Sequence, residues 1–468
     1  MGVEEEKKRL LQTERIAWFQ REIPLHELVK VYYSDINDEH NHGIYCALLP
    51  IKRKASSLKK VSWDLLHGHG QPDAIVYHEG KKEIVEYLRY GNEEGIEPLV
   101  LDRRFHGIRP DHKEISEEFR LFHDLFYDKK SDEFYKFNDA GDEELIAKIT
   151  ENSVEIRLKE IRQFIAAKEM VLVLQFDFRE SSAHNLSKLE ITGTVEDKHN
   201  SVMTWGINFG NLRIGKSESF SRLLGKRYIE PLPKKQSGLW AFGKEEPDQF
   251  VEFIIGQDEH GKNIFHTSDP DTLGNNFGAN SDEPHYLTPV QFKLDVLDKY
   301  YSQSGKYRVE DSVLWCGSLW SLYIDNHHDD KVFAWLGDLG RDLPYSEQLF
   351  WRAHNVPPNE KMSDTFYGRQ ILAKFTNSDR PEHLFQLKYR ELGEASDKYI
   401  GWRILKPLRQ PDQHHLHGIR LPLNNEQGEF DALVLGLTKL LIDSINERKL
   451  NENITKVEKE SIKGSISL

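Results

Sequence analysis

The stretch NSVEIRLKEIRQFIAAKEMVLVLQFDF, residues 152–178, joins a helical pattern to an apolar strand. Ile156, Ile161, Phe164 and Ile165 recur at helical spacing, so its first part predicts an amphipathic helix. Residues 170–176 form a short and almost entirely apolar run, which is typical of a strand buried on both faces. A buried strand next to a packed helix predicts mixed α and β structure.

Segments on either side carry the same two kinds of pattern. Residues 28–33 and 44–49 have the composition of strands, and residues 74–77 and 84–88 predict a hairpin. Residues 430–448 have the spacing of an amphipathic helix. The 468 residues exceed a typical domain of roughly 100–200 residues. We therefore predict an α+β, multi-domain fold of mixed sheets with packed helices and a C-terminal amphipathic helix.

Changes in composition indicate the domain boundaries. Residues 181–221 are mostly polar, and the cluster PLPKKQSG at 231–238 interrupts regular structure. We expect four regions: an N-terminal mixed α/β domain over 1–180, a β-rich and loop-dense middle region over 181–300, a C-terminal α/β domain over 301–450, and a polar tail over 451–468.

Charge and cysteine content limit the partners and the setting. The 63 basic and 77 acidic residues give a net charge of −14, which repels nucleic acid at long range, although a local basic groove could still bind it. Cys46 and Cys316 alone provide no disulfide framework, as is usual in a reducing compartment. No window approaches the roughly 18 apolar residues of a membrane span. We expect a cytoplasmic protein with a protein partner or a second copy of itself, and no membrane partner.

Three carboxylates in the predicted hairpin form the first candidate site. Asp73 follows a proline, and Glu83 and Glu86 lie on the second strand. This stretch resembles the PD-(D/E)xK nucleases, and the resemblance implies that Asp73 and Glu86 would hold Mg²⁺ or Mn²⁺ to activate water. The lysine of that motif is missing, because Leu88 occupies its position and Arg89 lies on the opposite face. We favour the alternative, a hairpin with exposed acids, and assign no cofactor outside the nuclease hypothesis.

Dense polar loops form the second candidate site. Residues 269–289 include the runs DPD, NNFGAN and PHYLTP, and residues 335–342 read WLGDLGRD. Such side chains suit a pocket of fixed polar contacts, but they also satisfy the backbone of an elaborate structural loop. The candidate ligand-binding residues are Asp271, Asn276, His285, Tyr286, Asp338 and Arg341.

Two further segments contain the residue types that bind metals. Residues 325–330 read DNHHDD between two apolar runs, and we interpret them as the solvated tip of a hairpin. Residues 409–417 read RQPDQHHLH, in which His415 and His417 alternate as on a strand and could bind a metal with Asp412. Because 21 histidines are spread over the chain, chance clusters are expected, and no metal is assigned.

The sequence contains no Gly-x4-Gly-Lys-Ser/Thr, Gly-x-Gly-x-x-Gly, Gly-x-Ser-x-Gly or His-Glu-x-x-His motif. The motifs FGAN at 277–280, PHYLTPV at 284–290, GDLGRDLP at 337–344 and EISEEFRLFH at 114–123 are similar to those of a full-length family of uncharacterised prokaryotic proteins. That family has no established activity, so the resemblance implies no functional residue. Its members resemble accessory genes of bacteria, which implies a setting in antiviral defence.

These observations lead to one expected function and two alternatives. We expect a cytoplasmic sensor or regulatory component of a bacterial antiviral (anti-phage) defence module, which recognises a ligand or partner through the 269–342 loops. The alternatives are a divalent-metal-dependent nuclease at Asp73, Glu83 and Glu86, and a structural assembly subunit.

Overall fold

The computed structural model describes residues 2–59, 68–90, 95–192, 196–214, 217–233, 235, 237–238, 249–422 and 426–453. The chain divides into two compact units. Unit 1 comprises Met1–Phe137 and Glu143–Pro247, and unit 2 comprises Asn138–Asp142 and Asp248–Leu468. Both units contain helices and strands, which confirms the predicted multi-domain α+β fold.

The division of the chain differs from the predicted one. Residue 180 falls inside strand β11 (Met170–Ser182), which pairs along its length with β14 (Ser217–Ile229). The polar stretch after residue 180 therefore belongs to the same sheet, and the predicted middle region 181–300 is split between the two units. Of the predicted tail 451–468, helix α13 includes residues up to Asn453, and 454–468 lie outside the described residues.

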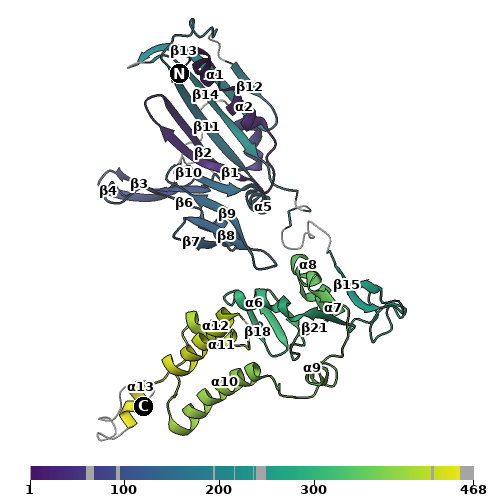
Figure 1. The fold of residues 1–468 in the computed structure, drawn as a ribbon. Coiled ribbons are helices and arrows are strands. Elements are labelled where there is room, and N and C mark those ends of the chain that lie inside the picture. The colour runs from purple at the N-terminus through teal and green to yellow at the C-terminus, as the bar shows by residue number, and fades with distance from the viewer. Residues whose placement is uncertain are drawn as a thin grey trace. The chain divides into compact units, whose positions relative to one another are not determined.

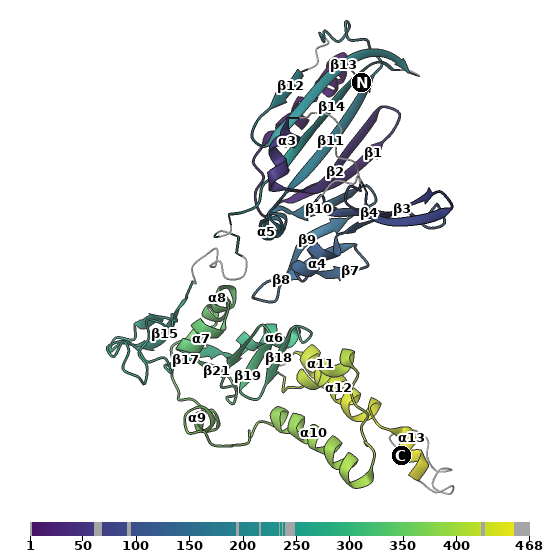
Figure 2. The same cartoon turned by 180° about the vertical axis from the view of Figure 1, so that it is seen from behind.

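A ten-stranded antiparallel sheet forms the body of unit 1 (Figures 1 and 2). The strand order is β12-β13-β14-β11-β2-β1-β10-β9-β8-β7. The remaining bounds are β1 Leu28–Ile36, β2 His40–Pro50, β7 Phe126–Asp128, β8 Glu133–Phe137, β9 Glu143–Ile149, β10 Ser153–Arg157, β12 Glu196–His199 and β13 Met203–Ile214. Strand β11 lies between β2 and β14 and is buried from Met170 to Phe176, as the apolar run predicts.

The helices of unit 1 are short and pack against this sheet. They are α1 Val3–Leu11, α2 Thr13–Gln20, α3 Lys54–Leu58, α4 Glu117–Phe122 and α5 Leu158–Lys168, with a 3-10 turn η1 at Ile51–Arg53. Between α1 and α2, the Gln12 amide donates to the Phe178 carbonyl at 3.1 Å and to Ser221 Oγ at 3.0 Å, which fixes the helix break on the sheet. Phe19 of α2 stacks on Phe176 with ring centroids 4.1 Å apart.

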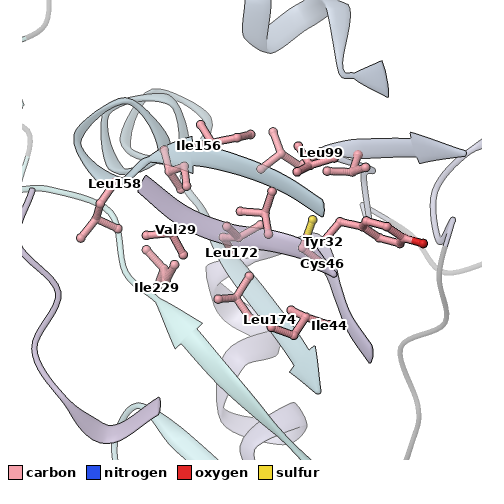
Figure 3. Close-up of a cluster of buried hydrophobic side chains, with 14 of the residues drawn as sticks. Val29, Tyr32, Ile44, Cys46, Leu99, Ile156, Leu158, Leu172, Leu174 and Ile229 are labelled. Carbon is pink, nitrogen blue, oxygen red and sulfur yellow. The ribbon is translucent and has the colours of Figure 1, made fainter. Parts of the chain in front are cut away.

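Neighbouring strands supply the main core of unit 1. Figure 3 shows Val29, Ile44, Leu172 and Ile229 directed into one cluster from β1, β2, β11 and β14. Ile156 belongs to the same cluster but lies in β10, so the predicted helix over this stretch begins only at Leu158. The strand prevails because β10 pairs with β1 and β9, which satisfies its backbone on both edges.

Two small hairpins complete unit 1. Strands β3 (Pro72–Glu79) and β4 (Lys82–Arg89) pair in the predicted hairpin, and β5 (Val100–Arg103) pairs with β6 (His112–Ile115). The β3–β4 hairpin projects away from the large sheet in Figure 1. All residues of β3 are exposed, as are most of those in β4.

Unit 2 combines small sheets with helices. The sheets are β15 (Glu252–Gln257) with β16 (Asn263–Thr267); β21 (Lys331–Trp335), β17 (Pro289–Lys293) and β22 (Asn355–Val356); and β18 (Tyr307–Glu310), β19 (Val313–Cys316) and β20 (Trp320–Tyr323). The helical segments are η3 Leu294–Leu297, α6 Asp298–Ser302, α7 Leu336–Asp342, α8 Tyr345–Ala353, α9 Asp364–Gln370, α10 Pro381–Ile400, η4 Gln410–Asp412, α11 Gln413–His417, α12 Gln427–Thr438, η5 Lys439–Asp443 and α13 Glu447–Asn453.

A buried carboxylate organises the aromatic core of unit 2. Glu347 on α8 accepts hydrogen bonds from Lys299 Nζ and from the Tyr300 hydroxyl, both at 2.6 Å, and from the Tyr307 hydroxyl at 3.2 Å. The indole of Trp351 donates to the Tyr300 hydroxyl at 2.7 Å. The Glu347 carboxylate, the Tyr300 and Tyr307 hydroxyls and the Trp351 indole N–H therefore each have a partner, which limits the cost of burying them.

The described part of the chain contains no helix that is both long enough and apolar enough to cross a membrane.

Candidate functional site

The predicted ligand loops contain a buried acid held by two neighbours. Asp338 on α7 is buried, accepts a hydrogen bond from the Tyr286 hydroxyl at 2.8 Å, and lies 3.0 Å from Arg341 Nη2. Burial raises the pKa of Asp338, against the opposing effects of the Tyr286 hydrogen bond and the Arg341 charge. Arg341 also forms two hydrogen bonds to Asp342, at 2.6 and 2.7 Å. The structure thus brings three of the predicted ligand-binding residues together, but their polar groups contact one another.

The other predicted loop residues are also occupied locally. His285 Nε2 lies 3.1 Å from Asn276 Oδ1, and His285 Nδ1 accepts the backbone N–H of Leu287 at 3.0 Å. Asp271 takes part through its backbone, whose carbonyl accepts from the Asn280 side chain at 2.9 Å. These contacts match the structural-loop alternative, in which polar side chains satisfy the loop backbone.

Close packing explains the glycines of the Gly-Asp-Leu-Gly motif. A Cβ atom at Gly337 would lie 2.2 Å from the Tyr286 ring, and one at Gly340 would lie 1.9 Å from the Ser268 carbonyl oxygen. Neither separation is sterically allowed, so helix α7 can approach the 268–286 loop only with glycine at both positions. The two glycines of the motif are therefore explained by the packing of helix α7 against this loop.

The three carboxylates of the nuclease hypothesis do not converge. In the β3–β4 register Asp73 pairs with Leu88, Ile75 with Glu86, and His78 with Glu83. Asp73 and Glu86 consequently share a face of the hairpin, while Glu83 lies on the opposite face. Within the described ranges, the acid and histidine groups that approach within 4.8 Å of one another include none of these three residues. The three carboxylates therefore do not form one such group among the described residues.

The predicted solvated tip at 325–330 is wrong for its first residues. Asp325 is fully buried, and its carboxylate accepts the backbone N–H of Ser363 at 2.6 Å and the Ser363 hydroxyl at 2.7 Å. Asn326 is also buried. The segment lies against α9 and the start of α10, and segments so distant in sequence cannot be recognised from local composition.

A hydrogen-bonded chain links this segment to helix α10. Asn326 Oδ1 accepts from the Ser312 backbone at 3.1 Å and its Nδ2 donates to the Glu310 carbonyl at 3.0 Å, so its amide orientation is fixed. The same Nδ2 lies 3.4 Å from His383 Nε2, which must then accept. His383 Nδ1 consequently carries the proton and donates to Ser378 Oγ at 3.0 Å.

The chain continues from Ser378 to a carboxylate. Ser378 Oγ also accepts the Arg380 backbone N–H at 3.1 Å, so its own proton points at His327 Nδ1, 3.1 Å away. His327 Nε2 lies 3.1 Å from Asp311 Oδ1. Burial lowers the pKa of His383 to about 4, which keeps this ring neutral near neutral pH.

Asp311, His327 and His383 have the composition of a metal site, because one donor atom from each lies within 4.8 Å of the others. Two observations oppose a metal there. Arg369 donates to both oxygens of Asp311, at 2.7 and 2.9 Å, so a cation already occupies the carboxylate. A metal would also have to displace the proton that Asn326 fixes on His383. We interpret the cluster as a hydrogen-bonded wall that positions the first turn of α10.

That first turn borders a cavity of about 190 Å³ in unit 2. Four separate segments line the cavity: Leu294, Leu297 and Tyr301; Asn326, His328 and Asp329; Arg380, Glu382 and His383; and Arg420, Leu421 and Pro422. The lining is mixed, with two guanidinium groups, two carboxylates, two imidazoles and a short apolar side. None of the six predicted ligand residues is among them.

Some polar atoms on this wall lack hydrogen bonds. Glu382 is nine-tenths buried; its Oε1 accepts from Arg380 Nε at 3.0 Å, whereas its Oε2 has no hydrogen-bond partner among the described residues. His328 Nε2 and Arg420 Nη1 also make no hydrogen bond within that part of the chain, although carboxylate oxygens of Asp325 and Glu429 lie 3.3 and 2.7 Å away. Among the described residues, Glu382 Oε2 is therefore the clearest unpaired acceptor on this wall.

Sequence reasoning missed most of this cavity. It singled out residues 325–330 for their ligand types but placed them in solvent. Arg380, Glu382 and His383 lie in the run Arg-Pro-Glu-His at the start of α10, where a proline at the first helical position marks the helix start. That signal predicts where the helix begins, but it does not predict that the charged first turn lies beside a cavity. His414, His415 and His417 lie on helix α11, so the strand-like alternation predicted there is wrong.

Comparison with protein-family models, curated proteins and solved structures gives no significant match.

Proposed function

We propose that this chain is a sensor or regulatory component, active in the cytoplasm, that recognises a small polar ligand in the unit 2 cavity. The observation that carries the proposal is Glu382 Oε2, a buried carboxylate oxygen on the cavity wall without a hydrogen-bond partner among the described residues. Leaving such an atom unpaired costs about 1–3 kcal/mol or more, because its hydration is lost without replacement. A ligand that donates a hydrogen bond to it recovers that cost on binding.

The lining also limits the chemistry of the ligand. Glu382 requires an N–H or O–H donor, and Arg420, whose guanidinium lies over the Tyr301 ring at 4.6 Å, favours an acceptor or an anionic group. The volume of about 190 Å³ is below that of sites for drug-sized molecules, roughly 300–1,000 Å³. We infer a compact ligand that carries a donor and an acceptor close together, such as a free amino acid or a nucleobase.

The test is a thermal-shift and calorimetry panel of amino acids, nucleobases and nucleosides with the full chain. We expect a compound that stabilises the wild type to bind Glu382→Gln roughly 10-fold to 100-fold more weakly, since the amide loses the ionised acceptor. The matched control is Glu394→Gln, an exposed change on the same helix α10. Equal affinity of the wild type and Glu382→Gln for every binding compound contradicts this site.

The antiviral setting rests on the resemblance of the loop motifs alone. If it holds, cells carrying the wild type survive phage challenge, and the correctly folded Glu382→Gln variant loses that protection. An Asp338→Ala variant tests the originally predicted loop; because Asp338 is buried and bonded to Tyr286, we expect its main effect on the stability of unit 2. If a well-folded Asp338→Ala variant loses protection while Glu382→Gln keeps it, the ligand site lies in the 269–342 loops and not in the cavity.

A structural assembly subunit is the second candidate function, favoured by the β3–β4 hairpin. Ile75, Val76, Val85 and Tyr87 are each more than half exposed there, on both faces of two strands. An isolated two-stranded hairpin is only marginally stable in water, so a protein partner or second copy would stabilise it. A native mass above one chain that falls to one chain in Val85→Lys supports assembly, and a monomeric wild type contradicts self-assembly.

A further inference from the structure

The turn between β1 and β2 brings two histidines and an aspartate together in unit 1. His40 and His42 stand two residues apart on β2, so their side chains share one face of the sheet. Asp35 on β1 is the direct cross-strand partner of His42. One donor atom from each of the three lies within 4.8 Å of the other two.

The rings are aligned before any ligand arrives. The imidazoles of His40 and His42 stack with centroids 4.0 Å apart and an interplanar angle of 8°. Glu180 on β11 holds the His42 ring through a 2.8 Å contact to Nε2, and Arg15 neutralises Glu180 at 2.6 Å. Arg15 therefore pairs with Glu180, and a carboxylate orients the His42 ring, as is common for metal-binding histidines.

One ring nitrogen has conflicting neighbours. His40 Nε2 lies 2.9 Å from Asp35 Oδ2, an acceptor, and 3.1 Å from Asn37 Nδ2. That amide nitrogen is a fixed donor, because Asn37 Oδ1 accepts the backbone N–H groups of Glu39 and His40 at 2.8 and 2.9 Å. No protonation state of His40 satisfies both neighbours. A cation between His40 and Asp35 removes the conflict with Asp35, and the Asn37 amide is left to donate to a cation-bound water.

We propose that Asp35, His40 and His42 bind a divalent transition metal of the zinc class. Two imidazoles and one carboxylate favour Zn²⁺ over Mg²⁺ or Ca²⁺, which prefer oxygen ligands only. Tetrahedral coordination at about 2.0–2.2 Å separates donors by roughly 3.3–3.5 Å; here His40 Nε2 and Asp35 Oδ2 are 2.9 Å apart, and the three donor atoms all lie within 4.8 Å of one another. The side chain of Asp35 is 40% exposed and that of His40 20% exposed, so solvent reaches the site and water can complete the shell.

This site is independent of the unit 2 cavity and goes beyond the proposed sensor function. It also differs from the Asp311–His327–His383 cluster, where Arg369 occupies the carboxylate. If the unit 2 cluster bound the metal instead, changes at His40 would leave binding unaltered, so the two sites are distinguished by one variant.

The test is isothermal titration of the full chain, prepared without a polyhistidine tag, with Zn²⁺, together with the visible absorption of bound Co²⁺. We expect one tight site in the wild type, weakened at least 10-fold in His40→Ala and in Asp35→Asn, with loss of the tetrahedral Co²⁺ spectrum. His260→Ala, an exposed histidine in another turn, is the matched control and retains the wild-type affinity. Affinity unchanged in both His40→Ala and Asp35→Asn, or no tight Zn²⁺ binding by the wild type, overturns the proposal.

Discussion

Replacing His123 by glutamine is expected to remove a defined part of the acid sensitivity of unit 1. His123 follows α4 and lies buried against the rings of Phe119, Phe122 and Phe164. Its Nε2–H donates to the Glu160 carbonyl at 2.9 Å. Burial lowers the pKa of His123 to about 4, although the hydrogen bond and charge of Glu160 oppose the shift.

The magnitude follows from the difference between the folded and unfolded states. An unfolded histidine has a pKa of about 6.5, so the unfolded chain binds the proton more tightly than the folded chain does. The stability associated with neutral His123 is fully present above about pH 6.5 and is lost as the pH falls toward about 4. A difference of roughly 2.5 pKa units corresponds to about 3 kcal/mol across that window.

Hydrogen exchange of the α5 and β11 peptides in urea reports the unfolding free energy of unit 1. The quantity to compare is the free-energy difference between wild type and His123→Gln at about pH 7 and at about pH 4.5, because all other titrating groups are shared. We expect the advantage of the wild type to shrink by about 2–3 kcal/mol at the lower pH. His26→Gln, at an exposed histidine, is the matched control. A difference for His123→Gln that is constant between the two pH values refutes the reasoning.

Two further changes test the packing of unit 1. A Cβ at Gly225 would lie 2.5 Å from the Thr204 carbonyl oxygen, so Gly225→Ala is expected to destabilise unit 1 by about 1–3 kcal/mol in urea unfolding. The control Gly256→Ala, which has open space around the added Cβ, is not expected to destabilise the chain. Equal effects of the two changes would contradict the close approach of β13 and β14. Burial raises the pKa of Cys46 to about 12, so a thiol reagent at neutral pH should label Cys46 only after unfolding, and rapid labelling of the native chain would contradict its place in the core.

The sequence predicts elements well where one face or both faces of the element are apolar. Strand β11 and the β3–β4 hairpin lie where the pattern places them, and a helix begins near the expected start of the C-terminal segment, at Gln427. The sequence pattern does not predict strand β14, because its buried positions include Ser219 and Ser221, which interrupt the apolar alternation. Ser221 accepts the Gln12 side chain, a partner more than two hundred residues away. Polar residues that are buried through distant partners look like loop residues in a single sequence.

The same reason limits prediction of the site. The predicted loops are rich in Asn, Asp, Gly and His because each such residue satisfies a neighbour, as His285 does with Asn276 and Asp338 with Tyr286. The unit 2 cavity uses fewer such residues, drawn from four segments that become neighbours only on folding. In this chain, a high density of polar residues in the sequence marks loops whose side chains bond to one another, whereas the proposed ligand site is distinguished by a polar atom without a hydrogen-bond partner among the described residues.

This distinction also separates the two histidine clusters. Around His383 the hydrogen bonds that fix its two ring nitrogens do not conflict, since Asn326 donates to Nε2 and Ser378 Oγ accepts from Nδ1, and we interpret the cluster as holding the start of α10. Around His40 one nitrogen faces both a donor and an acceptor, so the cluster lacks a component. Composition alone ranks the two alike, since each offers two imidazoles and one carboxylate. The direction of the hydrogen bonds, which only the folded structure defines, is the reason that we propose a cation at the β1–β2 turn and none at the unit 2 cluster.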